Sequence, residues 1–288
     1  MRFQPLRWVG VLPFFAFSAL FLIAPTLYIV INSFRSGVSA IEGANFWTLQ
    51  NFRDLMTPSV INAYWVSIKI SFFSAVLGCL IGFAMAAAVT FGQLPRVLKQ
   101  PLLTFSGVAS NFAGVPLAFA FIATIGPAGL ITLWLRNEFG INLRVLGFNL
   151  LSTRGLVITY LFFQIPLMIL IITPALEGLK REWREAAAIL GATGAQYWRM
   201  VALPILFPSL LGTLALLFAN SFGAVATAIA LTGPSLNIAP ILLYAQIRGD
   251  VLGSPNVGYA LATGMIVITA LANGLYIWLR TRSERWLK

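Results

Sequence analysis

Hydrophobic residues are gathered in six long runs along the chain, and most charged residues lie between these runs. A helix needs about 20 apolar residues to cross the hydrocarbon core of a bilayer. The runs therefore predict membrane spans at about 11–34, 61–91, 102–125, 156–177, 205–231 and 257–280. Because a spanning segment must satisfy its own backbone hydrogen bonds, the predicted fold class is all-α. We expect one polytopic membrane domain over residues 1–288.

The first run follows Arg2 and Arg7, as the apolar part of a secretory signal would. It is too long for such a signal, and no clear cleavage site follows it, so an uncleaved first span is predicted. The stretch 131–139 has helical apolar spacing but is too short to cross a bilayer. We expect a short helix on the membrane surface there.

Small residues and prolines predict how the spans pack and bend. Gly78 and Gly82 are four residues apart, which favours close helix packing either within the chain or with another subunit. Pro25, Pro116 and Pro166 lie inside the predicted spans and are expected to kink them.

The composition changes the picture by excluding several function classes. The chain is 59% hydrophobic and only 9% charged, whereas soluble domains are about a quarter charged. Its net charge of +11 comes from basic residues between apolar runs, so nucleic acid is not an expected partner. The chain has no histidine and one cysteine, which excludes His-based acid–base catalysis and paired-cysteine chemistry.

The basic residues also predict the orientation, because Lys and Arg concentrate in cytoplasmic loops. Twelve fall on one side of the predicted spans and seven on the other. The larger group is Arg2, Arg7, Arg96, Lys99, Lys180, Arg181, Arg184, Arg199, Arg280, Arg282, Arg285 and Lys288; the smaller is Arg35, Arg53, Lys69, Arg136, Arg144, Arg154 and Arg248. Both termini are then expected in the cytoplasm.

The cytoplasmic loop at about 178–204 has the most informative pattern. Residues 182–190 favour a helix with Trp183, Ala186, Ala187 and Leu190 on one face. Gly191 suits the left-handed conformation that ends a helix.

A second short helix is expected after the turn at Gly194, with Tyr197, Trp198 and Val201 close to one face and Pro204 ending it. The physics of the loop allows two interpretations. It could rest on lipid headgroups, or its exposed aromatic residues could anchor a partner protein.

The loop resembles the EAA motif of permease subunits in binding-protein-dependent ABC importers of the type I family. That motif is EAA, three residues, Gly, nine residues and Ile-x-Leu-Pro. The residues that match are Glu185, Ala186, Ala187, Gly191, Leu203 and Pro204, with Val201 where Ile is usual. The stretches 25–34 and 48–52 also resemble the end of the first span and the periplasmic "TLxNY" segment of this family.

The resemblance implies a transport subunit of the bacterial inner membrane. It implies that the loop docks an ABC ATPase subunit and that a second permease, identical or homologous, completes the path. It also implies a periplasmic substrate-binding protein that delivers the solute.

The chain lacks the sequence Gly-x-x-x-x-Gly-Lys-Ser/Thr, so no cofactor is expected here and ATP and Mg²⁺ would bind the partner. No motif of a hydrolytic or metal enzyme occurs either, so the chain is not expected to be an enzyme.

Polar residues within the spans are candidates for the translocation path. These are Asn111, Gln164, Asn220 and Ser221, which could instead form hydrogen bonds between helices. None of the eight acidic residues falls in the middle of a predicted span. Ion-coupled carriers usually bury such residues, so that alternative is weakened. A membrane scaffold without transport activity is the other alternative.

The substrate is less well indicated than the class. The sequence looks most like the spermidine/putrescine group, whose relatives carry phosphonate, iron or sulfate. Residues 218–225 correspond to a segment that often holds an acid in polyamine- and sulfate-type permeases. Here Gly223 and Ala224 occupy it, which puts a substrate contact carried over from that group in doubt.

Overall fold

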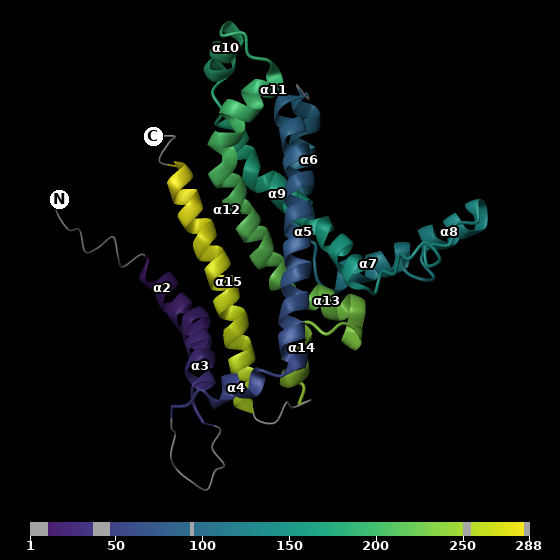
Figure 1. Cartoon of the computed structure of the whole chain (residues 1–288), viewed down its shortest axis with the longest axis vertical. Coiled ribbons are helices and arrows are strands. Elements are labelled where there is room, and N and C mark those ends of the chain that lie inside the picture. Colours follow the sequence, from purple (N-terminus) through teal and green to yellow (C-terminus); the bar gives the residue numbers. More distant parts are fainter. Residues whose placement is uncertain (1–10, 37–46, 93–94, 250–254, 285–288) are drawn as a thin grey trace, which may run out of the picture. The chain divides into compact units, whose positions relative to one another are not determined.

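The computed structural model of the chain describes residues 11–36, 47–92, 95–249 and 255–284. These residues are almost entirely helical, and an isolated bridge between Arg35 and Trp47 is the β-pairing recorded among them. The chain divides into two compact units, Met1–Asn62 with Leu242–Val267, and Ala63–Ile241 with Ile268–Lys288. Figure 1 labels the helices that build them.

Six helical stretches among the described residues are long and apolar enough to cross a membrane, so the predicted all-α class with about six spans is confirmed. They are Leu12–Ser33, Pro58–Phe91, Val115–Phe139, Thr153–Glu177, Gly194–Phe222 and Asn256–Thr281. Four of them coincide closely with predicted runs. The third and the fifth differ because glycines break the helices where hydropathy alone shows continuous apolar sequence.

The predicted third span at 102–125 is wrong, since helix α6 (Arg96–Asn111) ends well before α7 (Val115–Ile125) begins. Gly114 separates them with a φ of 76°, and its N–H donates to Thr227 Oγ1 at 2.7 Å. Pro116 lies in the first turn of α7, where a missing N–H costs nothing, so it starts a helix and does not kink one.

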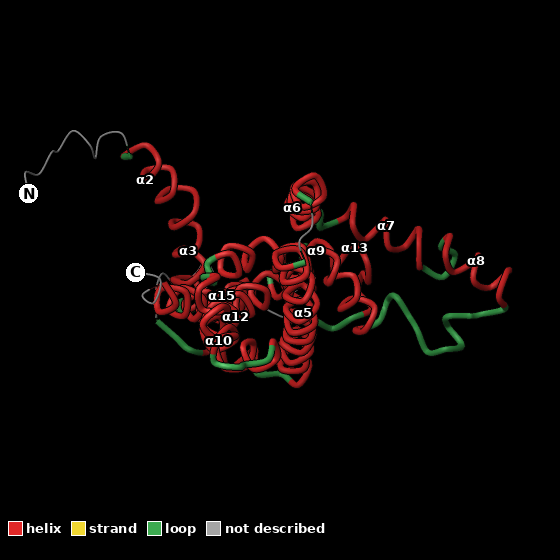
Figure 2. Tube along the Cα trace, turned by 90° about the horizontal axis from the view of Figure 1, so that it is seen from above, coloured by secondary structure: helices red, strands yellow, loops and turns green. Residues whose placement is uncertain are grey.

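Helix α8 (Leu130–Phe139) follows α7 after a short turn, at the place predicted for a short surface helix. Together the two helices form the stretch 115–139 that is long enough to span. Both views show α7 and α8 extending away from α5 and α9 (Figures 1 and 2).

The predicted fifth span at 205–231 is also interrupted. Helix α12 (Leu203–Phe222) ends at Gly223, and α13 (Val225–Thr232) starts a new axis after Ala224. A 3₁₀ turn η3 (Gly233–Ser235) then leads to α14 (Ala239–Ile247).

In the first unit, α2 (Leu12–Ser18), the π turn η1 (Ala19–Ile23) and α3 (Ala24–Ser33) form one helical stretch. Pro25 lies just after the π turn, where the wider backbone accommodates it. Helix α4 (Gln50–Leu55) is fastened to the end of α3 by Asn51. The amide of Asn51 donates to the carbonyls of Ser33 and Arg35, each at 2.8 Å. This contact explains why an asparagine stands in the Thr48–Phe52 segment.

In the second unit, α5 (Pro58–Phe91) packs closely on α9 (Thr153–Glu177). A Cβ atom placed on Gly78 would lie 2.7 Å from the Cβ of Gln164, and one on Gly82 would lie 2.6 Å from the Cβ of Met168. The small-residue face therefore packs within the chain, and this decides between the two predicted uses. Helix α15 (Pro255–Glu284) runs through both units and reaches the C-terminal end of the described chain.

Candidate functional site

The loop at 178–204 begins with helix α10 (Arg181–Ile189), whose residues favour helix and whose end is capped by the backbone. Gly191 has a φ of 79°, as predicted for the residue that ends this helix. Its N–H donates to Ala188 O at 3.0 Å, and Ala192 N–H donates to Ala187 O at 2.9 Å. These two bonds form a Schellman cap, which satisfies carbonyls that the helix end would otherwise leave unpaired.

The second turn is held by a capping box that the sequence analysis missed. Thr193 Oγ1 accepts from Gln196 N–H at 3.3 Å, and Gln196 Oε1 accepts from Thr193 N–H at 2.7 Å. The spacing Thr-x-x-Gln before a helix was the signal that could have shown it. Helix α11 (Gly194–Tyr197) starts from this cap.

Pro204 does not end the second helix, so this prediction is wrong. Helix α11 passes through the π turn η2 (Trp198–Ala202) into α12. Leu203 N–H donates to the carbonyl of Trp198, five residues earlier, so the backbone is wider just before the proline. Pro204 follows directly, and the wider turn makes room for its ring inside a continuous helix. The loop and the fifth span are consequently one continuous helical element.

The aromatic residues of the loop point inward, which corrects their predicted role as exposed anchors. Tyr197 is only 8% exposed. Trp198 packs edge-on against Phe83 and Phe91 of α5, at centroid distances of 6.2 and 5.5 Å. Trp183 is half-buried, with Lys180 Nζ 5.8 Å from its ring centroid. These side chains hold the loop to the membrane helices.

The outward face of α10 carries aliphatic residues that were not predicted as exposed. Ile189 and Leu190 are 86% and 87% exposed. Ala186 lies on the same face, while Ala187 is half-buried. The predicted apolar face is thus split, with Trp183 and Ala187 packed on the core and Ala186 and Leu190 open to a partner.

The residues of the EAA motif are likewise divided between exposed and half-buried positions. Glu185, Gly191, Leu203 and Pro204 are exposed, and Val201 is half-buried. Glu185 forms an ion pair with Arg181 Nε at 2.9 Å, one helical turn away. Both side chains are largely exposed, so the pair is weak and its carboxylate can accept from another protein.

A cleft of about 650 Å³ opens beside α10, between that helix and the end of α5. Its lining includes Thr90, Lys180, Arg181, Arg184, Glu185 and Tyr197. Thr90 Oγ1 is buried there and has no hydrogen-bond partner among the described residues. A partner side chain that enters the cleft would meet a mainly basic rim.

The four candidate path residues fall into two pairs. Gln164 and Ser221 are buried and come together. Gln164 Nε2 donates to Leu217 O at 2.8 Å and to Ser221 Oγ, and Ser221 shares a hydrogen bond of 2.7 Å with Ser74 Oγ. This buried cluster joins α5, α9 and α12.

Asn111 and Asn220 are exposed and take no part in the hydrogen bonds of the buried cluster. Asn111 donates to the carbonyl of Gly107 at 2.9 Å, within its own helix. Asn220 directly precedes the buried Ser221 in the chain, and its own side chain is exposed to a neighbouring subunit or to lipid.

The fold and the loop define a class: a multi-span helical membrane protein in which a short amphipathic helix, α10, lies outside the spans and leads through a tight turn into one of them. Residues 78–288 match the family described as binding-protein-dependent transport system inner membrane component, and the chain belongs to this family. It is therefore an inner-membrane transport component.

Curated relatives with similar sequences transport different solutes. The sulfate transport system permease protein CysW of Escherichia coli (strain K12) is 26% identical over 272 residues, covering 93% of this chain and 87% of CysW. The molybdenum transport system permease protein ModB of Mycobacterium tuberculosis (strain ATCC 25618 / H37Rv) is 28% identical, covering 92% and 91%. The spermidine/putrescine permease protein PotC of E. coli (strain K12) is 26% identical, covering 86% and 85%.

Solved structures show the same fold at low sequence identity. A chain of a bacterial ABC transporter that imports the acidic polysaccharide alginate matches with a TM-score of 0.69 at 14% identity, covering 98% of this chain and 96% of that one. A chain of the MetNI methionine ABC transporter matches with a TM-score of 0.53 at 14% identity, covering 79% and 94%.

Proposed function

We propose that this chain is a permease subunit of an ATP-driven importer and that the loop 178–204 docks its ABC ATPase. The observation that supports this most is the exposed face of α10. Ala186, Ile189 and Leu190 offer an aliphatic surface, and Glu185 adds a carboxylate beside it. A protein partner would bury this surface, and the motif spacing points to an ATPase as that partner.

The loop would pass movement to the spans through one rigid element. Because α11, η2 and α12 are continuous, a displacement at Thr193 moves the same helix that carries Asn220 and Ser221. Nucleotide in the ATPase can change the permease only through a difference in binding between two permease states. The docked α10 is the contact that would supply this difference.

The path itself would form against a second permease, identical or homologous. Asn220 and Asn111 are polar and exposed in the single chain, although each lies on a helix built largely of apolar residues. A polar path between two subunits would explain their exposure. The periplasmic binding protein would then deliver the solute to the opposite end from the docking loop.

A small oxyanion of the sulfate or molybdenum type is the substrate that we favour. Among the described residues, no acidic side chain lies in the middle of a span, so a polyamine would find no carboxylate there. A polyamine is the second candidate, supported by the similarity to PotC.

The docking proposal is tested by Glu185→Lys in the full transporter. Glu182→Lys is the matched control, since Glu182 is exposed on the same helix but lies outside the motif. We expect Glu185→Lys to abolish ATP-dependent uptake while the chain stays in the membrane, and Glu182→Lys to keep most of it. Uptake that persists in Glu185→Lys would show that the loop does not dock the motor.

The substrate is tested by uptake in a strain that lacks this chain. Labelled sulfate, molybdate and putrescine are compared after return of the wild-type gene or of the Glu185→Lys gene. We expect an oxyanion signal that only the wild type restores. A signal for putrescine alone would overturn the oxyanion assignment, and no restored signal for any solute would support a scaffold.

A further inference from the structure

A second pocket, distant in sequence from the docking loop, lies between α8 and the loop that follows it. Gly140 ends α8 with a φ of 64°, and the chain turns back so that residues 142–150 lie beside the helix. The pocket has a volume of about 170 Å³. In the predicted orientation it faces the periplasm.

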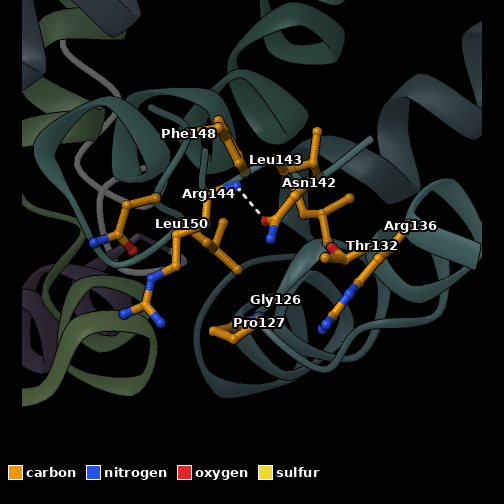
Figure 3. Close-up of a pocket in the computed structure, with 11 residues that line it drawn as sticks. Gly126, Pro127, Thr132, Arg136, Asn142, Leu143, Arg144, Phe148 and Leu150 are labelled. Carbon is orange, nitrogen blue, oxygen red and sulfur yellow. Dashed lines mark hydrogen bonds between the residues drawn. The ribbon is translucent and has the colours of Figure 1, made fainter. Parts of the chain in front are cut away.

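Hydrogen-bond donors dominate the polar lining of this pocket. Arg136 and Arg144 lie on opposite sides of it, with Asn142 and Thr132 between them (Figure 3). Neither guanidinium has a hydrogen bond or ion pair with another described residue. The nearby acid Glu138 does not line the pocket. Both arginines are exposed to solvent, and two like charges that line one small pocket favour an anion there because they otherwise repel each other.

The two asparagines of the pocket are oriented as donors. Asn142 Oδ1 accepts from Arg144 N–H at 3.1 Å, and Asn149 Oδ1 accepts from Leu151 N–H at 3.0 Å. Each backbone contact fixes the amide oxygen and leaves the amide N–H₂ without a partner among the described residues. Thr132 Oγ1 is buried at the pocket wall and is also unpaired. The Thr132 hydroxyl is the buried group among them, and buried polar groups nearly always have a partner, whereas Asn142 is half-buried and Asn149 is exposed. Together these groups fit a ligand with several acceptor oxygens.

The surroundings of the pocket are apolar and open. Leu130, Trp134 and Phe139 on α8 are exposed, as are Val145 and Leu146 in the loop that follows it. An exposed tryptophan beside basic residues is typical of a membrane–water interface. A phosphate held by the arginines would then belong to a lipid whose acyl chains cover this apolar surface.

We propose that Arg136, Arg144, Asn142 and Thr132 form a binding site for a tetrahedral phosphate-type oxyanion, supplied by the headgroup of an anionic phospholipid. Guanidinium groups match phosphate oxygens in a two-pronged geometry. The site goes beyond the proposed transport function, because it needs neither ATP nor the docking loop.

The test uses the full-length chain in its transporter complex, purified in detergent and titrated with short-chain phosphatidylglycerol under native mass spectrometry. We expect Arg136→Gln and Arg144→Gln each to weaken lipid binding about tenfold or more. Arg154→Gln is the control, since Arg154 is exposed and lies outside the pocket, and it should bind as the wild type does. Arg136→Lys keeps the charge and should lose less than Arg136→Gln.

Two further arms separate the sources of the oxyanion. Phosphatidylcholine, whose headgroup has no net charge, should bind weakly and without dependence on Arg136. Inorganic phosphate or sulfate that binds in place of the lipid, and is lost in the Gln variants, would retain the oxyanion site but overturn the lipid source. Binding of all probes that is unchanged in Arg136→Gln and Arg144→Gln would overturn the site itself.

Discussion

Single residues decide how the docking loop and the polar cluster are built. Gly191 provides the left-handed turn that ends α10, while Gln164 and Ser221 join three helices through their hydrogen bonds. Asn220, one residue from Ser221, is exposed. Neighbouring positions on one helix thus have different roles, one in packing and the other on a surface that a second subunit would cover.

Gly191→Ala is the sharpest residue-scale prediction, because nothing lies within 4 Å of a Cβ placed there. The substitution therefore tests the backbone conformation alone. The left-handed region costs a residue with a Cβ about 1–2 kcal/mol, which would lower the equilibrium ratio of capped to uncapped loop by a factor of about 5–30. We expect a corresponding loss of ATP hydrolysis that is coupled to uptake.

The control for this prediction is Gly191→Asn, since asparagine tolerates the left-handed region better than alanine. It should retain more activity than Gly191→Ala at equal expression. Equal activity of Gly191→Ala and the wild type would mean that the cap at 191 does not position α10 for its partner.

At the scale of elements, hydropathy predicted well which stretches are helical. It predicted much less well where the helices break. The interruptions at Gly114 and Gly223 lie within apolar sequence. Mean hydropathy is the same whether an apolar helix faces lipid or another helix, so it does not show these breaks. The inward packing of Trp198 depends on Phe83 and Phe91, more than 100 positions away. The sequence shows an aromatic residue in the loop, but not the partner on α5 that buries it.

The contact between α5 and α9 is a second prediction at this scale. Gly82→Val would place a side chain 2.6 Å from Met168 Cβ and 2.9 Å from the carbonyl of Ile165. Overpacking of this kind costs about 1–3 kcal/mol, so thermal unfolding of the detergent-solubilised chain should occur at a lower temperature. Gly107→Val is the matched control in α6, since no atom lies within 4 Å of its Cβ. Equal unfolding temperatures for the two variants would show that α5 and α9 can separate at little cost.

At the scale of the whole molecule, the charge distribution separates an ATP-driven importer from an ion-coupled carrier. The described acidic residues lie at helix ends and in α4, α8 and α10, and Glu177 at the end of α9 pairs with Lys99 at 2.7 Å. A carrier driven by an ion gradient needs ionisable groups along its path. Among the described residues, no acidic side chain lies in the middle of a span, which favours the proposal that energy enters through a partner docked on the loop.

Uptake should therefore respond to the loss of ATP and not to the loss of the ion gradient. With cellular ATP held constant by glycolysis, a protonophore that collapses the membrane potential should leave the initial rate of uptake nearly unchanged. Inactivation of the partner ATPase, by contrast, should abolish uptake, as Glu185→Lys should. Because the two treatments remove different energy sources, the opposite pattern would assign transport to an ion gradient. The aliphatic face of α10 would then need another partner.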